Sequence, residues 1–307
     1  MKKTMIMALV GILLLAACGQ SYEETKRQTR QQRILAWKQD SSALKIAVMP
    51  TLDCLPMYVA EYYQLFDSVG DGVRLKHYMA QMDCDTAMER GRVEGAFSDL
   101  VRAKKMEQRG TKLRFFSATN AKWVLVTNRN ARIHQLKQLD DKMVAMTRFS
   151  ATDLLTDRVI DSVKLDKDRV FKVQINDLSV RLQMLQNNEM DAMWMPEPLA
   201  TAARQLKHSV IYDSEKEDIQ LGVLVFNEKE MQRQGRSKQL KMFIKGYNQA
   251  CDSINKYGVR RYSDLIVKYC KMKKQIADSV PNNLRYVHAR GPREKDIALV
   301  EKWLGKK

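Results

Sequence analysis

The chain has 307 residues, and its 53 Lys and Arg against 36 Asp and Glu give a net charge of +17. This length is enough for one large or two ordinary domains with buried cores. The basic excess favours anionic neighbours, such as an acidic ligand or lipid head groups, although basic and acidic residues are mixed along the chain and much of the charge is expected to be solvated surface.

The first 17 residues have the features of an export signal. Lys2 and Lys3 precede an apolar run from Met5 to Leu15, and two alanines follow directly before Cys18. This order is typical of a secretory signal peptide, and the apolar run is too short to remain as a transmembrane helix. The letters LAAC that end at Cys18 also resemble the lipobox of bacterial lipoproteins, in which the cysteine is acylated and becomes the mature N-terminus.

We therefore predict a lipoprotein that is cleaved before Cys18, carries lipid such as palmitate on that cysteine, and is held to a membrane. Residues 1–17 are the signal peptide and residues 18–43, which are polar and charged, are a lipidated tether. The protein is expected to face the periplasm or the cell surface, where nucleic acid is a poor partner. An ordinary signal peptide cut near Ala17 is the alternative, and which membrane holds the anchor stays open.

From residue 44 onward, short β-rich runs alternate with amphipathic helical stretches. Strands are predicted at residues 44–49, 73–79, 95–98, 113–118, 123–128, 143–147, 170–175, 192–195, 210–213 and 221–227. Helices are predicted at residues 57–65, 83–92, 100–108, 134–139, 152–163, 179–187 and 198–206, and the remainder from 229 to 307 is mostly helical. The alternation indicates βαβ units, parallel sheets and an α/β fold.

Two lobes accommodate these elements. Lobe 1 is predicted to comprise residues 44–122 and 220–307, and lobe 2 residues 123–219, with two extended crossings near 120–128 and 220–227. Ligands of open α/β sheets bind at the carboxyl ends of the strands. Two lobes that face each other across such ends form a cleft that can close by a hinge motion.

Three segments together resemble a known family. They are LKIAVMPTLDCLPMYVAEYYQLF (44–66), GRVEGAFSDLVRA (91–103) and EMDAMWMPEPLATAA (189–203). In this order they resemble the type II periplasmic solute-binding proteins of ABC importers, in the NMT1/THI5-like branch that includes nitrate, taurine, alkanesulfonate and thiamine-precursor binders. The resemblance covers nearly all of residues 44–227. It implies a two-lobed periplasmic binding protein fold, a small-molecule ligand in the cleft, and an ABC permease of the inner membrane as partner; we expect a monomer.

Polar residues that follow the strands of lobe 1 are candidate ligand contacts. Thr51 and Asp53 follow the first strand, and Ser98 and Asp99 follow the third. Each acid also has a structural alternative, because Asp is a common N-cap: Asp53 for the helix that begins near Pro56, and Asp99 for the helix 100–108.

Lobe 2 contributes a predicted anion site. Ser150, Ala151 and Thr152 lie where a strand gives way to a helix, whose free amides attract anionic oxygens. The alternative is that Ser150 and Asp153 form a capping motif.

Three further candidates complete the predicted ligand site. Asn120 lies on the first crossing, and Trp194 and Glu197 follow from the last strand of lobe 2. Trp often lines ligand sites, and a carboxylate suits a positive or hydroxylated group. The mixture of acidic side chains with an anion-binding helix start favours a zwitterionic or partly cationic ligand over bare nitrate.

Four cysteines follow Cys18, and none has the spacing of a metal site, so neither a metal nor a cofactor is predicted; they are Cys54, Cys84, Cys251 and Cys270. An oxidising compartment permits disulfides. Cys54 and Cys84 follow the first two strands, which would be neighbours in a parallel sheet. We predict a disulfide between them at the cleft rim.

The sequence offers no catalytic constellation. Its 4 histidines stand alone, without an HExxH or GxSxG motif. We therefore predict a binding protein with no catalytic residues: a lipoprotein of an ABC importer that captures a small anionic or zwitterionic organic solute, sulfonate-like or thiamine-precursor-like, by hinge closure. A ligand-sensing accessory lipoprotein is the main alternative. An enzyme on the same fold is less favoured, because the thiamine-pyrimidine synthases that share it are intracellular.

Overall fold

The structure is a computed structural model, and it describes residues 22–66 and 72–306. The predicted signal peptide and Cys18 lie outside the described residues. The chain divides into two compact units, one that ends at Ala43 and one that begins at Leu44. No helix in the two described stretches is long and apolar enough to cross a membrane.

The first unit contains one described helix, α2 (Tyr22–Ser42), of 21 residues. Its sequence is rich in Gln, Arg, Lys and Glu, and its apolar Ile34 and Leu35 are exposed. A helix that is mostly polar has little apolar surface to bury in a core. It spans roughly 30 Å at 1.5 Å per residue and covers most of the segment predicted to be a tether.

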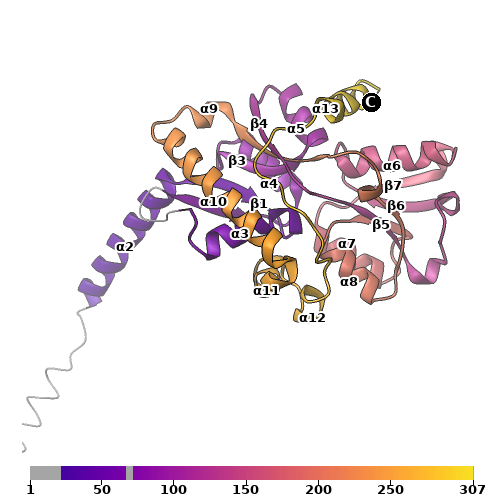
Figure 1. The fold of residues 1–307 in the computed structure, drawn as a ribbon, viewed down its shortest axis with the longest axis horizontal. Helices are drawn as coiled ribbons and strands as arrows, with labels where there is room; N and C mark the ends of the chain where they lie inside the picture. Colours follow the sequence, from indigo (N-terminus) through magenta and orange to yellow (C-terminus); the bar gives the residue numbers. More distant parts are fainter. Residues whose placement is uncertain (1–21, 67–71, 307) are drawn as a thin grey trace, which may run out of the picture. The chain divides into compact units, whose positions relative to one another are not determined.

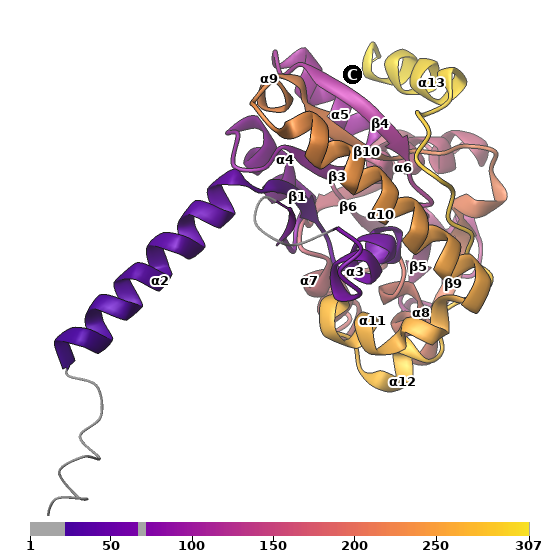
Figure 2. The ribbon, with the colours of Figure 1, turned by 60° about the vertical axis from the view of Figure 1, so that its left-hand side comes forward.

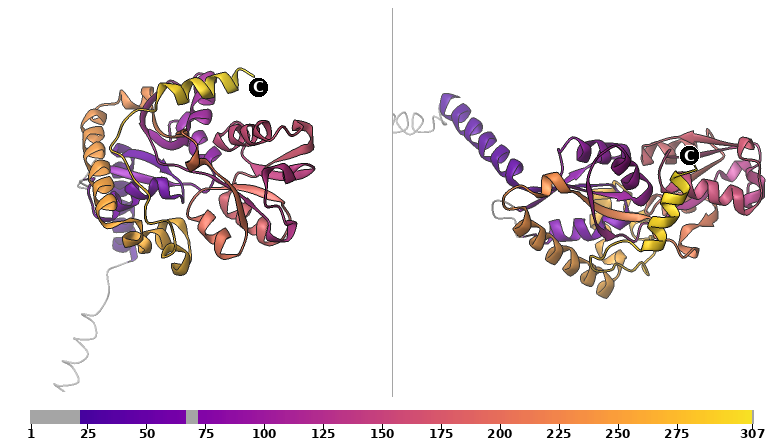
Figure 3. Two further views of the ribbon diagram at one scale, coloured as in Figure 1. Left: turned by 45° about the vertical axis from the view of Figure 1, so that its right-hand side comes forward. Right: turned by 90° about the horizontal axis from the view of Figure 1, so that it is seen from above.

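The second unit contains two five-stranded sheets (Figures 1 and 3). The first sheet has the order β2 (Val73–His77), β1 (Leu44–Val48), β3 (Gly95–Asp99), β10 (Gly222–Asn227) and β4 (Leu113–Ala118). The second has the order β7 (Val170–Gln174), β6 (Lys142–Met146), β8 (Ala192–Met195), β5 (Val124–Thr127) and β9 (Ser209–Asp213). Below, lobe 1 is the part built on the first sheet and lobe 2 the part built on the second.

Both sheets follow one plan. In lobe 1, β1 is parallel to β2 and β3, whereas β10 is antiparallel to β3 and β4. In lobe 2, β6 is parallel to β7 and β8, whereas β5 is antiparallel to β8 and β9. The parallel strands come from the predicted βαβ units, and the antiparallel strands are those that enter from the other lobe.

Helices cover both faces of the first sheet. Successive side chains of each strand point to opposite faces, so each strand contributes to a core on either side. Ile46 and Val48 of β1 pack with α3 (Leu55–Tyr62), α10 (Arg236–Tyr257) and α11 (Ser263–Cys270) on one face (Figure 2). Ala47, on the other face, joins a core that includes residues of α4 (Gln81–Glu89) and α5 (Leu100–Gln108). That second core continues into lobe 2.

The helices of lobe 2 and the C-terminal elements complete the unit. Lobe 2 has α6 (Ala151–Ser162), α7 (Leu178–Gln186) and α8 (Leu199–Gln205). The chain then returns to lobe 1 and forms the short α9 (Glu228–Met231), α10, α11, the short α12 (Lys274–Ala277) and α13 (Glu294–Leu304). Helix α13 contacts both lobes: Glu301 pairs with Lys104 of α5 at 3.0 Å, and Trp303 Nε1 donates to Asp157 Oδ2 of α6 at 2.9 Å.

Two chain crossings join the lobes and bond to each other. The Thr119 amide donates to the Gly222 carbonyl at 2.9 Å, and the Ser214 amide donates to the Trp123 carbonyl at 3.0 Å. The crossings lie between β4 and β5 and between β9 and β10, close to their predicted positions. The predicted lobe boundaries at 122/123 and 219/220 fall within them and stay a prediction.

Nearly every predicted strand and helix is present within a few residues of its predicted place. The segment 134–139, predicted as a short helix, is instead a 3₁₀ turn, η3 (Leu136–Leu139). Between α12 and α13, residues 279–293 contain no helix. The fold class is confirmed as α/β with two lobes.

The predicted Cys54–Cys84 disulfide is wrong, because both residues are free, buried thiols. Strands β1 and β2 are neighbours, as predicted. The chain nevertheless leaves them on opposite faces of the sheet: Cys54 packs in the core with α3 and α10, and Cys84 in the core with α4 and α5.

Candidate functional site

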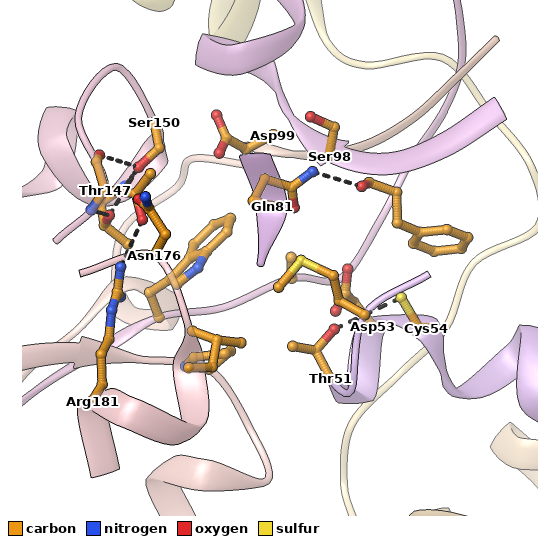
Figure 4. A pocket seen from close by; sticks show the side chains of 17 residues that line it. Thr51, Asp53, Cys54, Gln81, Ser98, Asp99, Thr147, Ser150, Asn176 and Arg181 are labelled. Atoms are coloured by element: carbon orange, nitrogen blue, oxygen red, sulfur yellow. Dashed lines mark hydrogen bonds between the residues drawn. The ribbon is translucent and has the colours of Figure 1, made fainter. Parts of the chain in front are cut away.

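A cavity lies between the lobes, at the carboxyl ends of the parallel strands of both sheets (Figure 4). It contains about 600 Å³ of empty space, part of it open to solvent. Lobe 1 contributes Thr51, Asp53, Gln81, Ser98 and Asp99. Lobe 2 contributes a second polar set, which consists of Thr147, Ser150, Thr152, Asn176 and Arg181.

Asp99 has two roles in the wall of lobe 1. As the N-cap of α5, its Oδ1 accepts from the Arg102 amide at 3.0 Å, so the capping alternative is correct, and the residue also lines the cavity. Burial raises the pKa of Asp99 to about 6, against the opposing effects of the Arg102 amide, the Arg102 charge and the Ala151 amide. Because Ala151 begins α6 of lobe 2, this carboxyl group touches both lobes.

Ser98 and Gln81 are held by the strand ends of lobe 1. Ser98 Oγ donates to Asp85 Oδ1 at 3.4 Å, and Gln81 Nε2 donates to the Phe97 carbonyl at 2.9 Å. The Asp85 carboxylate pairs with the Arg102 guanidinium, which is also buried. These hydrogen bonds fix the polar groups that lobe 1 presents to the cavity.

Asp53 is the other acid of the lobe 1 wall, and it does not cap α3, whose N-cap is Cys54. Burial raises the pKa of Asp53, although the Thr51 hydroxyl, its own amide, the Thr119 hydroxyl and the Cys54 amide act in the opposite direction. Thr119 Oγ1 lies 3.5 Å from Asp53 Oδ2. In the described part of the chain, no Lys, Arg or His forms an ion pair with this carboxylate.

At the start of α6, where an anion site was predicted, several polar groups instead form hydrogen bonds with side chains of the same segment. Ser150 Oγ accepts from the Thr152 amide at 3.1 Å and donates to the Thr147 carbonyl at 2.7 Å. Thr152 Oγ1 accepts from the Thr147 amide at 3.0 Å. Ser150 and Thr152 line the cavity, while Ala151 does not and meets Asp99 through its amide. Ser150 therefore caps α6, as in the alternative, but Asp153 does not complete the capping motif, since its Oδ2 accepts from the Phe149 amide at 2.9 Å.

Arg181 of α7 is the cationic group of the cavity wall, and only 2% of the residue is exposed. Its Nε donates to the Ile175 carbonyl at 2.8 Å, its Nη1 to the Trp194 carbonyl at 2.8 Å, and its Nη2 to Thr147 Oγ1 at 2.7 Å. All three acceptors are neutral. Burial lowers the pKa of Arg181 to about 10, so the guanidinium remains charged at neutral pH.

No carboxylate of the described residues forms an ion pair with Arg181. A buried charge without a counter-ion is costly in free energy, and proteins rarely tolerate it outside functional sites. The side of the cavity formed by lobe 2 therefore has an unbalanced positive charge.

Sequence reasoning missed Arg181, although a signal was present. The buried residues of α7 are Leu178, Arg181 and Leu185, so a charged residue stands on the apolar stripe of an amphipathic helix. Thr147, Asn176 and Gln81 were missed as well. Trp123 also lines the cavity.

Besides Ala151, three predicted ligand residues do not lie in the wall of the main cavity. Trp194 is fully buried in the core of lobe 2, where its Nε1 donates to Thr156 Oγ1 at 2.8 Å, so its prediction as a ligand contact is wrong. Successive residues of β8 point to opposite faces, and Trp194 points into the core.

The other two, Asn120 and Glu197, line a small adjoining cavity near Leu284. Asn120 Nδ2 donates to the Arg285 carbonyl at 3.1 Å. Glu197 pairs with Arg204, and its Oε2 accepts from the Thr201 amide at 3.0 Å. The carboxylate of Glu197 is thus engaged within lobe 2.

The lobes touch each other around the cavity. The Leu52 amide donates to the Glu197 carbonyl at 3.0 Å, and Arg102 Nη1 donates to the Arg148 carbonyl at 3.3 Å. Ala80 and Asp177 form an isolated antiparallel bridge. These contacts hold the two lobes together around the cavity.

Comparison with known families and structures identifies the family of this chain and the solved proteins that share its fold. The sequence pattern described as NMT1/THI5 like matches residues 51–280, which include the polar walls of both lobes. The chain belongs to the NMT1/THI5-like family. No curated protein matches this NMT1/THI5-like chain in sequence.

Solved structures share the fold of the NMT1/THI5-like chain. The alkanesulfonate-binding protein SsuA from Xanthomonas axonopodis pv. citri, bound to MOPS, has a TM-score of 0.74 at 10% identity over 86% of this chain and 92% of its own. The ligand-binding component of an ABC-type import system from Staphylococcus aureus has a TM-score of 0.71 at 14% identity, covering 86% and 92%. The nitrate-binding protein NrtA from Synechocystis PCC 6803 has 0.67 at 10%, covering 82% and 74%.

The raised pKa of Asp99 predicts how stability depends on pH. The folded protein holds this proton up to a pH of about 6, whereas an unfolded chain releases it near 3.8. Stability should therefore fall as the pH rises between these values, by up to about 3 kcal/mol for this residue. Asp99→Asn keeps an N-cap but cannot titrate. Urea unfolding of both proteins from pH 4 to 7 should show the wild type losing stability relative to the variant; parallel curves would contradict the assignment.

Proposed function

We propose that this NMT1/THI5-like protein is the substrate-binding component of an ABC importer and that it captures a small organic solute with an acidic group. The observation that carries the proposal is Arg181, a buried cation in the cavity wall whose protein partners are all neutral. An acidic ligand group would supply the missing counter-charge. Charge-assisted hydrogen bonds to a planar guanidinium suit sulfonate and carboxylate oxygens.

The comparisons support this class of ligand. Among the structural neighbours, one protein is named for alkanesulfonates and another for nitrate. We infer that a sulfonate-like solute, anionic or zwitterionic, is the first candidate and a thiamine-precursor-like pyrimidine with an acidic substituent the second.

Closure follows from the placement of polar groups on both lobes. A ligand that contacts Arg181 of lobe 2 and the Ser98–Asp99 edge of lobe 1 binds the closed form more tightly than the open one. Such preferential binding shifts the population toward closure, and the closed face then docks on the permease. The bonded crossings at Thr119–Gly222 and Trp123–Ser214 are the proposed hinge.

We infer that the protein is not an enzyme. The thiol that lines the cavity, Cys54, is a poor nucleophile, because burial raises its pKa well above the ordinary range. None of the four histidines is among the residues that line the cavity in the described structure. A binding role accounts for the site without a chemical step.

The role of Arg181 is tested by two variants. Arg181→Gln removes the charge, and Arg181→Lys keeps a charge but lacks the planar guanidinium that can donate two parallel hydrogen bonds. Titration calorimetry against a panel of alkanesulfonates, carboxylates and aminopyrimidine acids should show that the wild type binds at least one of these acids. The Gln variant should lose about 100-fold or more in affinity, and the Lys variant less.

Arg158→Gln is the matched control, because Arg158 forms a partly exposed pair with Glu217 away from the cavity wall. It should leave the affinity unchanged. A folded Arg181→Gln protein, verified by circular dichroism, that binds the same acid as tightly as the wild type would refute the proposed counter-ion.

We also propose that the protein is exported, cleaved before Cys18 and anchored by lipid on that residue, with residues 18–43 as the tether. Intact mass spectrometry of protein from a bacterial membrane fraction should give a chain that begins at Cys18 and carries acyl groups. Cys18→Ser should abolish the added mass and release the protein from the membrane. An unmodified N-terminus on membrane-bound wild-type protein would contradict the anchor.

A further inference from the structure

The basic excess of the chain is concentrated in its C-terminal helices. Residues 236–278 contain 11 Lys and Arg against 3 Asp. Residues 44–235, which include all of lobe 2 and the sheet of lobe 1, contain 28 Lys and Arg against 27 Asp and Glu. The basic stretch comprises α10, α11 and α12, and none of its residues lines the cavity between the lobes in the described structure. This charge therefore does not belong to the ligand site.

The excess charge faces outward from one layer of helices. Helices α3, α10 and α11 pack on the same face of the first sheet, where their apolar residues form a core (Figure 2). On α10, Phe243 and Tyr247 are buried in that core, while Lys238, Lys241 and Lys245 are exposed on the opposite side of the helix. Spacings of three and four residues place these lysines in one row along the outer surface.

The row of lysines has no counter-charge in the protein. Of the three acids in residues 236–278, two pair with Lys274, and the third, Asp252, bonds to His288. In the described part of the chain, no acid forms an ion pair with any of the three α10 lysines. Like charges at this spacing repel each other, and an anionic surface would relieve the repulsion.

Exposed tyrosines lie beside lysines of the same layer. Tyr62 at the end of α3 and Tyr257 at the end of α10 are 54% and 57% exposed. Lys268 of α11 lies over the Tyr62 ring, with its Nζ 5.5 Å from the ring centroid, and Lys256 lies over the Tyr257 ring at 5.1 Å. Aromatic rings with a polar tip, interspersed with lysines, are typical of protein surfaces at the head-group level of a bilayer. An electrostatic contact with a soluble acidic protein would require the lysines but not the rings.

The exposed lysines and tyrosines of this helix layer form a basic face. It consists of Lys238, Lys241, Lys245, Lys256, Lys268, Tyr62 and Tyr257. We propose that the basic face binds the surface of a bilayer that contains anionic lipids. The ammonium groups pair with lipid phosphates, and the tyrosine rings enter the head-group layer. The contact turns the helix layer of lobe 1 toward the membrane and uses no residue of the cavity wall, so it is independent of which solute the cavity binds.

The contact has a different role from a covalent anchor. Because the lysines are exposed, salt screens their attraction to the bilayer, and the binding is reversible. The basic face orients a protein that is already held near a membrane and does not replace a lipid on the chain. The release from the membrane that is expected of Cys18→Ser is therefore unchanged.

Vesicle flotation tests the basic face in the absence of an acyl chain. The parent protein is residues 18–307 with Cys18→Ser, which keeps the folded unit that begins at Leu44 and excludes any contribution from lipidation. Vesicles of phosphatidylcholine are compared with vesicles in which phosphatidylglycerol replaces part of it. At about 0.1 M salt the parent should bind the anionic vesicles about 10-fold or more tightly than the neutral ones, and at about 1 M salt this preference should disappear.

A triple variant of the basic face removes the row of charges. Lys238→Gln, Lys241→Gln and Lys245→Gln together should weaken binding to anionic vesicles about 10-fold or more. All three side chains are exposed, so the variant should remain folded, which circular dichroism verifies.

The charge-matched control removes three exposed lysines of lobe 2, by Lys137→Gln, Lys207→Gln and Lys216→Gln. It lowers the net charge by the same amount and should change vesicle binding by less than about 3-fold, because these lysines lie outside the basic face. Equal losses in the two triple variants would show that the charge of the whole protein is responsible, and the inference would fall.

A tyrosine variant separates a bilayer from a soluble acidic partner. Tyr62→Ser with Tyr257→Ser should weaken binding to anionic vesicles about 3-fold or more, yet leave binding to soluble polyglutamate unchanged. If this variant binds vesicles as the parent does, while the α10 lysines are needed for both anions, the basic face suits an acidic protein and the inference is wrong. A parent protein that shows no preference for anionic vesicles would also overturn it.

Discussion

The Arg181 guanidinium ties together the ends of three strands of lobe 2. Its three hydrogen bonds go to Ile175, which follows β7, to Trp194 of β8, and to Thr147, which follows β6. These are the parallel strands of the second sheet, so one side chain fixes the edge from which lobe 2 contacts the cavity. The same bonds leave the charge itself without a partner. The shape of the site and its unbalanced positive charge thus have a common origin.

Closure depends on groups that reach across the cleft. Backbone contacts at Leu52–Glu197 and Arg102–Arg148 bring the lobes together, while the Asp99 carboxyl group meets the start of α6. None of these contacts balances Arg181 or Asp53. A closed cleft without ligand therefore encloses uncompensated charge, and an open cleft exposes it to water. Under the proposed function, an acidic ligand that supplies the counter-charge of Arg181 favours the closed form for this electrostatic reason.

The order of strands and helices was predictable from the sequence because hydrophobic periodicity and β-rich runs report local structure directly. The positions of Asp99 and Ser98 at the cavity were also predictable, since they follow a parallel strand. The direction in which each side chain points was not predictable. Trp194 lies on β8, whose four residues are all buried, and the sequence does not show that its indole belongs to the core and not to the cavity. Cys54 and Cys84 follow neighbouring strands, yet the connections leave the sheet on opposite sides. Arg181 could have been predicted as a site residue only from the observation that a charged residue occupies the apolar stripe of a short helix.

The central claim is that an acidic ligand group in the interlobe cavity pairs with Arg181. A crystal structure of the protein with a bound solute, obtained from the calorimetric panel, tests it most directly. The account predicts a sulfonate or carboxylate with an oxygen within hydrogen-bonding distance of the Arg181 guanidinium, at about 3 Å, and the lobes closed around it. A bound solute that places its acidic group elsewhere, with no ligand atom facing Arg181, would contradict the account.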